Sequence, residues 1–401
     1  MQKHHNRTIS LSAKIAAYVF ALFSVIAPAR AQWSIMKADA DSLIKAGSDH
    51  IYNMQFERAS ADFGKVSQMY PEHPASYFLD AMVEWWRIKT VDNPKDEALE
   101  QAFMTKIDKA INVSQKLLDQ SEYDITGLFF KAGALGYRGR FYAERERWVK
   151  AAADGKDALE MLQKAQRIAP GNHDILLGTG LYNYLAQALP EQYPALKSVM
   201  FFLPAGNKQV GLSQLVAASN KARYAATESK VVLLQVYSMF EKNPDELLKL
   251  STELHAKYPN NPYFHWYLGR AYTQLGYTDK MEETWREIVK AAIDKKPGYN
   301  RSYAREALYY IGQALMARGE YEDALKYFYK ADEAGRSLTR DDDGWILHTN
   351  MNIGKIYDMQ GKRDLAVKQY SKIMSWREKF SSKYDQQFQM AQELIQKPYG
   401  Q

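Results

Sequence analysis

Residues 311–331 read IGQALMARGEYEDALKYFYKA, and this stretch decides the fold. Gly312 and Ala324 are small at the two positions where the antiparallel helices of a hairpin would cross closely, and Gly319 stands between them where a turn is expected. Phe328 is large and can fill the space toward a neighbouring hairpin. A hairpin of this kind leaves one apolar face that only another hairpin can cover, so the stretch predicts a stack of repeated units.

The same skeleton recurs along the chain with a period of about 34 residues, which is typical of arrays of paired helices. Apolar residues elsewhere follow the spacing of a helix, and few runs alternate with the period of a strand. Proline, glycine and asparagine mark the breaks between units, as at residues 170–172 and 296–298. Clear units begin near Glu228, Pro262, Arg305 and Leu347, and an N-terminal unit carries Gly47, Phe56, Ala59, Phe63, Val66 and Pro71.

The repeated residues resemble the tetratricopeptide repeat family over most of the chain. The resemblance implies an all-α fold, a right-handed superhelix (α-solenoid) of about eight helical hairpins, with a capping helix over about residues 384–396. Two parts depart from the family pattern: we expect long helices over about 94–120 and 124–153, and an apolar insertion over 188–208. The insertion is similar to an element of exported bacterial proteins of this family.

The first 31 residues do not share the repeat pattern. A basic start is followed by an apolar run of 13 residues from Ile15 to Ala27 and by the small-x-small sequence Ala29-Arg30-Ala31. Because a helix needs about 20 residues to span a bilayer, we interpret residues 1–31 as a cleaved signal peptide, with an uncleaved anchor as the alternative. We therefore predict export, most simply to a periplasm, with secretion or outer-membrane association as alternatives. The mature chain divides into an N-terminal helical array over 32–222 and a C-terminal array over 223–401.

The charge balance gives no indication of nucleic-acid binding. The chain has 53 Lys and Arg against 47 Asp and Glu, a formal charge of +6, but residues 1–31 hold four of the basic residues and no acidic ones. The remainder is near +2, because 49 basic residues face 47 acidic ones, and a basic domain with clustered Lys and Arg is missing. The chain has no cysteine, which excludes disulfides, thiolate nucleophiles and thiolate metal sites.

No catalytic motif is present, and we assign no catalytic, cofactor-binding or metal-binding residue. The histidines are scattered, no two lie four residues apart, and neither a nucleophile elbow nor a phosphate-binding loop occurs. Residues 341–344 read Asp-Asp-Asp-Gly, but consecutive carboxylates do not match the alternating ligands of an EF-hand, so we expect a solvated loop. Residues 144–147 read Glu-Arg-Glu-Arg, which predicts a salt-bridged helix surface.

The concave surface is the candidate binding site, because the resemblance implies that the first helix of each hairpin lines an inner groove. Aromatic and Arg side chains dominate binding hot spots and suit recognition of a helix or an extended peptide. We therefore expect a protein or peptide partner, with packing inside the core as the alternative role of these side chains. The expected groove residues are Trp266, Arg270, Tyr309, Gln313, Met351 and Lys355, with Phe78, Met82 and Trp85 nearer the N-terminus.

The insertion is a second candidate contact surface. It is too short to cross a bilayer, but it can lie on a membrane surface or fill a partner's groove. Alternatively it folds back to plug the inner groove and cover Leu181 and Leu185, which would hide an apolar patch that is otherwise a liability. Its apolar residues are Leu196, Val199, Met200, Phe201, Phe202 and Leu203, with Lys197 as the one charge among them.

These observations favour an exported, non-enzymatic scaffold that binds a protein or peptide in its concave groove, in envelope assembly or secretion. Two alternatives stay open. One is an α-helical envelope enzyme, which requires an Asp or Glu pair within about 10 Å in a closed cleft. The other is a peripheral membrane protein that uses residues 195–203.

Overall fold

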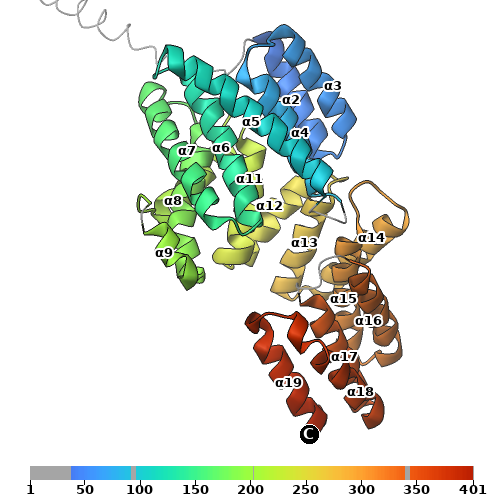
Figure 1. The fold of residues 1–401 in the computed structure, drawn as a ribbon. Helices are drawn as coiled ribbons and strands as arrows, with labels where there is room; N and C mark the ends of the chain where they lie inside the picture. Colours follow the sequence, from blue (N-terminus) through green and yellow to red (C-terminus); the bar gives the residue numbers. More distant parts are fainter. Residues whose placement is uncertain (1–37, 92–95, 202, 339–343, 401) are drawn as a thin grey trace, which may run out of the picture.

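The structure is a computed structural model that describes residues 38–91, 96–201, 203–338 and 344–400. Over these ranges the secondary structure is helical, with no strand. The predicted signal peptide, the three aspartates of the 341–344 loop and Phe202 lie outside the described residues. The predicted all-α class is confirmed, and the helices pack in adjacent antiparallel pairs (Figure 1).

Four hairpins form the N-terminal part of the stack. In the fourth hairpin the insertion separates the two helices and contains a short helix of its own, α9. The hairpins are α2 (Ala38–Tyr52) with α3 (Phe56–Met69), α4 (Pro74–Ile88) with α5 (Glu97–Gln120), α6 (Ile125–Glu144) with α7 (Trp148–Ile168), and α8 (Ile175–Gln192) with α10 (Lys208–Lys221), with α9 at Lys197–Met200.

Four more hairpins and a final helix follow, so the expected number of units and the capping helix are confirmed over the described residues. A π-helical turn, Val236–Phe240, ends the first of these helices. The hairpins are α11 (Ala226–Gln235) with α12 (Pro244–Lys257), α13 (Pro262–Leu275) with α14 (Thr278–Ile293), α15 (Arg301–Ala317) with α16 (Tyr321–Arg336), and α17 (Trp345–Met359) with α18 (Arg363–Met374), followed by α19 (Asp385–Gln396).

Close helix crossing explains the glycine of the repeat. A Cβ added to Gly312 would lie 2.8 Å from the ring of Phe328, which is closer than real contacts allow. The same clash, with an aromatic ring sixteen residues further along, would arise in three other hairpins. The pairs are Gly47 with Phe63, Gly269 with Trp285, and Gly354 with Tyr370. The sequence spacing that predicts the hairpins therefore reflects a direct contact between the glycine of one helix and the aromatic ring of the next.

One predicted helix is wrong. The sequence suggested a helix over 124–153, but α6 ends at Glu144 and α7 begins at Trp148. Glu146 turns the chain with a left-handed φ of 57°, and the Arg145 guanidinium, 2.6 Å from Glu100 on α5, ties the turn down. Glu144 ends the helix, and the charged residues 145–147 form a turn rather than a helix surface. No glycine, proline or asparagine marks this turn, so the usual sequence signals of a helix break are missing there.

The N-terminal turn of the stack closes on itself. Asn261, the N-cap of α13, donates from Nδ2 to the main-chain oxygen of Tyr52 at the end of α2, 2.8 Å away. Asn300, the N-cap of α15, donates in the same way to the main-chain oxygen of Val91, 3.1 Å away. Each pair is separated by 209 residues. We call this contact between α2–α4 and α11–α15 the seam.

Other groups along the seam reinforce the closure. Asp41 accepts hydrogen bonds from Arg223 at 2.8 Å and from the Tyr224 hydroxyl at 2.7 Å. The rings of Trp86 and Phe264 lie 6.1 Å apart across it. One continuous apolar cluster therefore reaches from α2 to α13, while the C-terminal hairpins, orange to red in Figure 1, extend away from the closed part.

Candidate functional site

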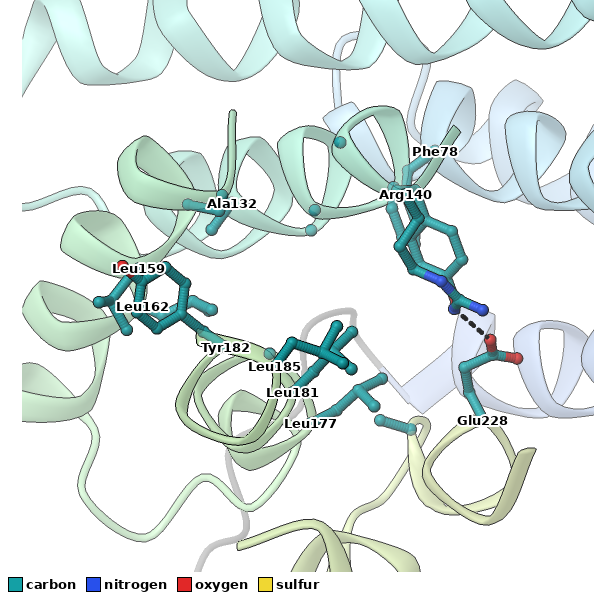
Figure 2. Close-up of a pocket in the computed structure, with 18 of the residues that line it drawn as sticks. Phe78, Ala132, Arg140, Leu159, Leu162, Leu177, Leu181, Tyr182, Leu185 and Glu228 are labelled. Atoms are coloured by element: carbon teal, nitrogen blue, oxygen red, sulfur yellow. Dashed lines mark hydrogen bonds and ion pairs between the residues drawn. The ribbon is translucent and has the colours of Figure 1, made fainter. Parts of the chain in front are cut away.

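A cavity of about 330 Å³ lies inside the closed turn (Figure 2). Its wall comes mainly from the first helices of successive hairpins, α2, α4, α6, α8 and α11, with α7 and the insertion completing it. These helices line the inner face of the stack, so closure at the seam converts a concave groove into a pocket. We call it the apolar pocket.

Aliphatic and aromatic side chains make up most of the wall. Figure 2 shows leucines of α8 pointing into the space between the helices. Leu159 and Leu162 of α7 lie at one end, and Phe78 of α4 lies at the other beside the Arg140–Glu228 ion pair. Pockets that bind small molecules are of this kind, largely apolar with a few polar groups, and their volumes start near 300 Å³.

The charged end of the apolar pocket is internally neutralised. Arg140 Nη1 lies 3.2 Å from Glu228 Oε1, and the Tyr52 hydroxyl donates to Glu228 Oε2, also at 3.2 Å. Burial raises the pKa of the Tyr52 hydroxyl, and the Glu228 carboxylate raises it further, so the phenol stays protonated. Burial lowers the pKa of Arg140, but Glu228 acting together with Tyr137, Glu144 and Tyr263 outweighs burial, so the net pKa is raised and the guanidinium stays charged. The pair joins α6 to α11 across the pocket.

Asp174 is the second carboxylate in the wall. Its Oδ1 accepts hydrogen bonds from the main-chain N–H groups of Tyr224 and Ala225, each at 2.8 Å, and so holds the start of α11. Its Oδ2 is buried and has no hydrogen-bond partner. Burial raises the pKa of this carboxyl group, against the main-chain hydrogen bonds that lower it. The two acidic groups of the pocket, Asp174 and Glu228, are thus both used to join helices.

The insertion folds against the inner face and forms part of the wall of the apolar pocket. The Tyr182 hydroxyl of α8 donates to the main-chain oxygen of Pro204 at 3.0 Å, which holds the end of the insertion in place. Phe201 points away, with 79% of its surface exposed. The wall residues from this segment are Leu196, Val199, Met200 and Leu203.

Comparison with known proteins identifies the repeat. Residues 303–379 match the family model described as tetratricopeptide repeat. Residues 303–379 are therefore tetratricopeptide repeats. The matched residues cover α15 from its third residue and all of α16–α18. The glycine–aromatic contacts described above extend the same hairpin geometry to α2–α3 and α13–α14. No curated protein matches the sequence.

Several solved structures align with the chain at low identity and low TM-score. Human IFIT1, solved as a dimer with PPP-AAAA, is 15% identical, with a TM-score of 0.44 over 91% of this chain and 87% of that chain. A tetratricopeptide repeat protein from Parabacteroides merdae is 14% identical, with a TM-score of 0.31 over 77% of this chain and 96% of that chain. A Rap protein complexed with Competence and Sporulation Factor is 13% identical, with a TM-score of 0.35 over 84% and 76%.

The N-terminal residues expected in the groove of this repeat protein divide into two groups. Phe78 and Met82 line the apolar pocket. Trp85 lies behind them in the core, 2% exposed, where its ring contacts Phe103 and Tyr137 at centroid distances of 5.5 Å.

The C-terminal residues lie on three successive repeats and do not reach the pocket. Arg270 sits over the ring of Trp266 and pairs with Glu306 on the next hairpin at 3.1 Å. Gln313 donates to the hydroxyl of Tyr309, which is buried, as is Met351. Lys355 is half-buried beside the Tyr399 ring. Trp266, Arg270, Gln313 and Lys355 keep partly exposed positions on this face, which we call the C-terminal inner face.

The sequence pattern does not predict most residues of the pocket wall, and it does not predict the Arg140–Glu228 ion pair. One signal was present: Ala132, Gly133, Gly136 and Gly139 follow helical spacing along one face of α6, and all four line the pocket. Small residues on an inner helix face leave space that a neighbour must fill. In the described ranges no group of three or more His, Asp and Glu is arranged to hold a metal ion, and no helix there is long and apolar enough to cross a membrane.

Proposed function

We propose that this repeat protein is an exported, non-enzymatic scaffold that holds a protein or peptide partner on its concave face, with the apolar pocket as the anchoring site. The closed pocket carries the proposal. The lining of this cavity of about 330 Å³ is mostly apolar, so an apolar group that enters it removes apolar surface from water, which is favourable. Export rests on the sequence of residues 1–31, and the exclusion of nucleic acid rests on the charge balance alone.

The C-terminal inner face supports the same proposal. Trp266 and Arg270 offer the residue types that dominate binding hot spots, and they stand on the helix that borders the seam. Arg270 is paired with Glu306 on this face, at 3.1 Å. A partner anchored in the pocket can therefore extend over an aromatic surface whose arginine is already paired.

Two glycines give a sharp test. Gly136 on α6 and Gly155 on α7 both line the apolar pocket, and a Cβ added to either meets no atom within 4 Å. In Gly136→Leu and Gly155→Leu the side chain therefore starts from a Cβ in open space and extends from the pocket wall. Gly64 on α3 also has no atom within 4 Å of an added Cβ but lies outside the pocket wall, so Gly64→Leu is the matched control.

Binding of an environment-sensitive apolar dye should be lost or weakened in Gly136→Leu and Gly155→Leu and unchanged in Gly64→Leu. The same order should hold for partners recovered by crosslinking in the native envelope. If the pocket variants bind the dye and recover the same partners as Gly64→Leu, the apolar pocket is not the anchoring site.

A further inference from the structure

The hydrogen bonding of the apolar pocket restricts what can enter it, and this inference rests on the binding function proposed above. The polar side chains of the wall are mostly bonded to the protein. Ser48 donates to the main-chain oxygen of Ile44 at 2.8 Å. The other bonds, described above, are those of Tyr52 and Arg140 to Glu228, Tyr182 to Pro204, Tyr224 to Asp41, and Asp174 to the start of α11.

A peptide backbone is poorly matched to such a wall. Each residue of a peptide brings one C=O and, except at proline, one N–H that need partners once they leave water. The described wall offers one buried acceptor without a partner, Asp174 Oδ2. An entering peptide segment would therefore leave most of its polar groups unsatisfied, whereas a hydrocarbon chain has none to satisfy.

The volume sets the length of chain that fits. An engineered apolar cavity of about 150 Å³ in another protein stays dry and takes up benzene, which has six carbons. A cavity of about 330 Å³ is roughly twice as large, so it has room for on the order of a dozen carbon atoms. The wall is long as well as apolar, because Leu159 and Leu162 lie at the opposite end from Phe78 and the Arg140–Glu228 pair (Figure 2).

We propose that the apolar pocket binds the aliphatic chain of an amphiphile, with about a dozen carbons inside and the polar group outside. Two sources supply this chemistry: a free fatty acid, or the acyl chain of a lipid-modified protein. The second source agrees with the scaffold function, because the pocket would hold the chain and the concave face would hold the protein that carries it.

The test measures affinity against chain length in full-length mature protein. One arm uses saturated fatty acids below their micelle concentrations, and the other uses a short Gly-Ser peptide acylated with the same chains, each displacing the apolar dye. Affinity should rise about fourfold per added methylene and level off at roughly a dozen carbons. Gly136→Leu should lower the affinity for the longer chains, and Gly64→Leu should leave it unchanged.

The arms also separate the two sources and the two proposals. If affinity rises equally with chain length in both arms, a free fatty acid is sufficient as the ligand. If affinity rises only for the acylated peptide, the ligand is the acyl chain of a lipid-modified protein. Either result supports an aliphatic ligand. If a non-acylated apolar peptide binds and is blocked by Gly136→Leu while neither arm depends on chain length, the aliphatic assignment is wrong but the binding function stands. If no probe distinguishes Gly136→Leu from Gly64→Leu, both proposals are wrong.

Discussion

Asn261 should contribute more to stability than its role as a helix cap explains. Its Oδ1 accepts the N–H of Tyr263 and caps α13, while its Nδ2 donates across the seam to the main-chain oxygen of Tyr52. Asn243 provides a comparison within the chain, because its side chain also caps a helix, α12, and is also followed by proline. The two asparagines differ in that Asn261 is buried and bonded across the seam, whereas Asn243 is exposed.

The difference can be given a magnitude. Loss of an asparagine cap costs about 1 kcal/mol. In Asn261→Ala the Tyr52 oxygen is also left buried without its partner, which adds about 1–3 kcal/mol. We therefore expect Asn261→Ala to lower the free energy of unfolding by about 2–4 kcal/mol and Asn243→Ala by about 1 kcal/mol. Substitution by aspartate sharpens the contrast, because aspartate caps helices as well as asparagine but cannot donate to a carbonyl.

Urea unfolding followed by tryptophan fluorescence measures all four variants, and Trp86 at the seam is one of the eight tryptophans that contribute to the signal. Asn243→Asp should be close to neutral, and Asn261→Asp should lose at least as much as Asn261→Ala. Equal losses at positions 243 and 261, in both the alanine and the aspartate pairs, would refute the view that the capping asparagine closes the turn.

Two further predictions concern packing and pH. Gly312→Ala should destabilise the protein by about 1–3 kcal/mol, because its Cβ would press on the ring of the facing helix, whereas Gly64→Ala in open helix should stabilise it by about 0.5–1 kcal/mol; thermal unfolding compares the two. Burial raises the pKa of Asp41, but hydrogen bonds from Arg223 and Tyr224 outweigh burial and hold the pKa well below its usual value. A carboxyl group whose pKa is lower in the folded than in the unfolded protein adds stability above the unfolded value of 3.8, and this stability is lost as the pH falls. Asp41→Asn should therefore flatten the decline in the free energy of unfolding below about pH 5. Denaturation at each pH measures it.

The hairpins could be predicted from the sequence because their determinants are local. A glycine and the aromatic ring that packs on it lie sixteen residues apart in four hairpins, so the pattern survives where other repeat positions vary. The turn at residues 145–147 could not be predicted, since a charged residue with left-handed φ and an ion pair to α5 replaces the usual glycine. Local signals fail where a long-range contact fixes a turn.

The pocket depends on contacts that the sequence does not display. Tyr52 and Asn261 are 209 residues apart, and neither belongs to the repeat pattern. Without knowledge of the contact across the seam, the inner face of the whole stack is expected to be an open groove. The repeat pattern therefore predicts groove residues on the C-terminal repeats as well as on the N-terminal ones. Of the N-terminal residues named from the sequence, Phe78 and Met82 line the pocket because they stand on the inner face of α4.

The glycines of the pocket suggest that its volume is selected rather than accidental. Glycine in a helix interior costs about 1 kcal/mol relative to alanine. Close crossing explains this cost at Gly312, but Gly136 and Gly155 have no neighbour within 4 Å of an added Cβ and both face the same cavity. Gly64 is a helix glycine that also has space around an added Cβ but lies outside the pocket wall. The evidence for selection is therefore the location of Gly136 and Gly155 in the pocket wall and not the presence of glycine as such. Larger residues at 136 and 155 would stabilise both helices and fill the cavity; glycine at both keeps it open, as a binding pocket requires.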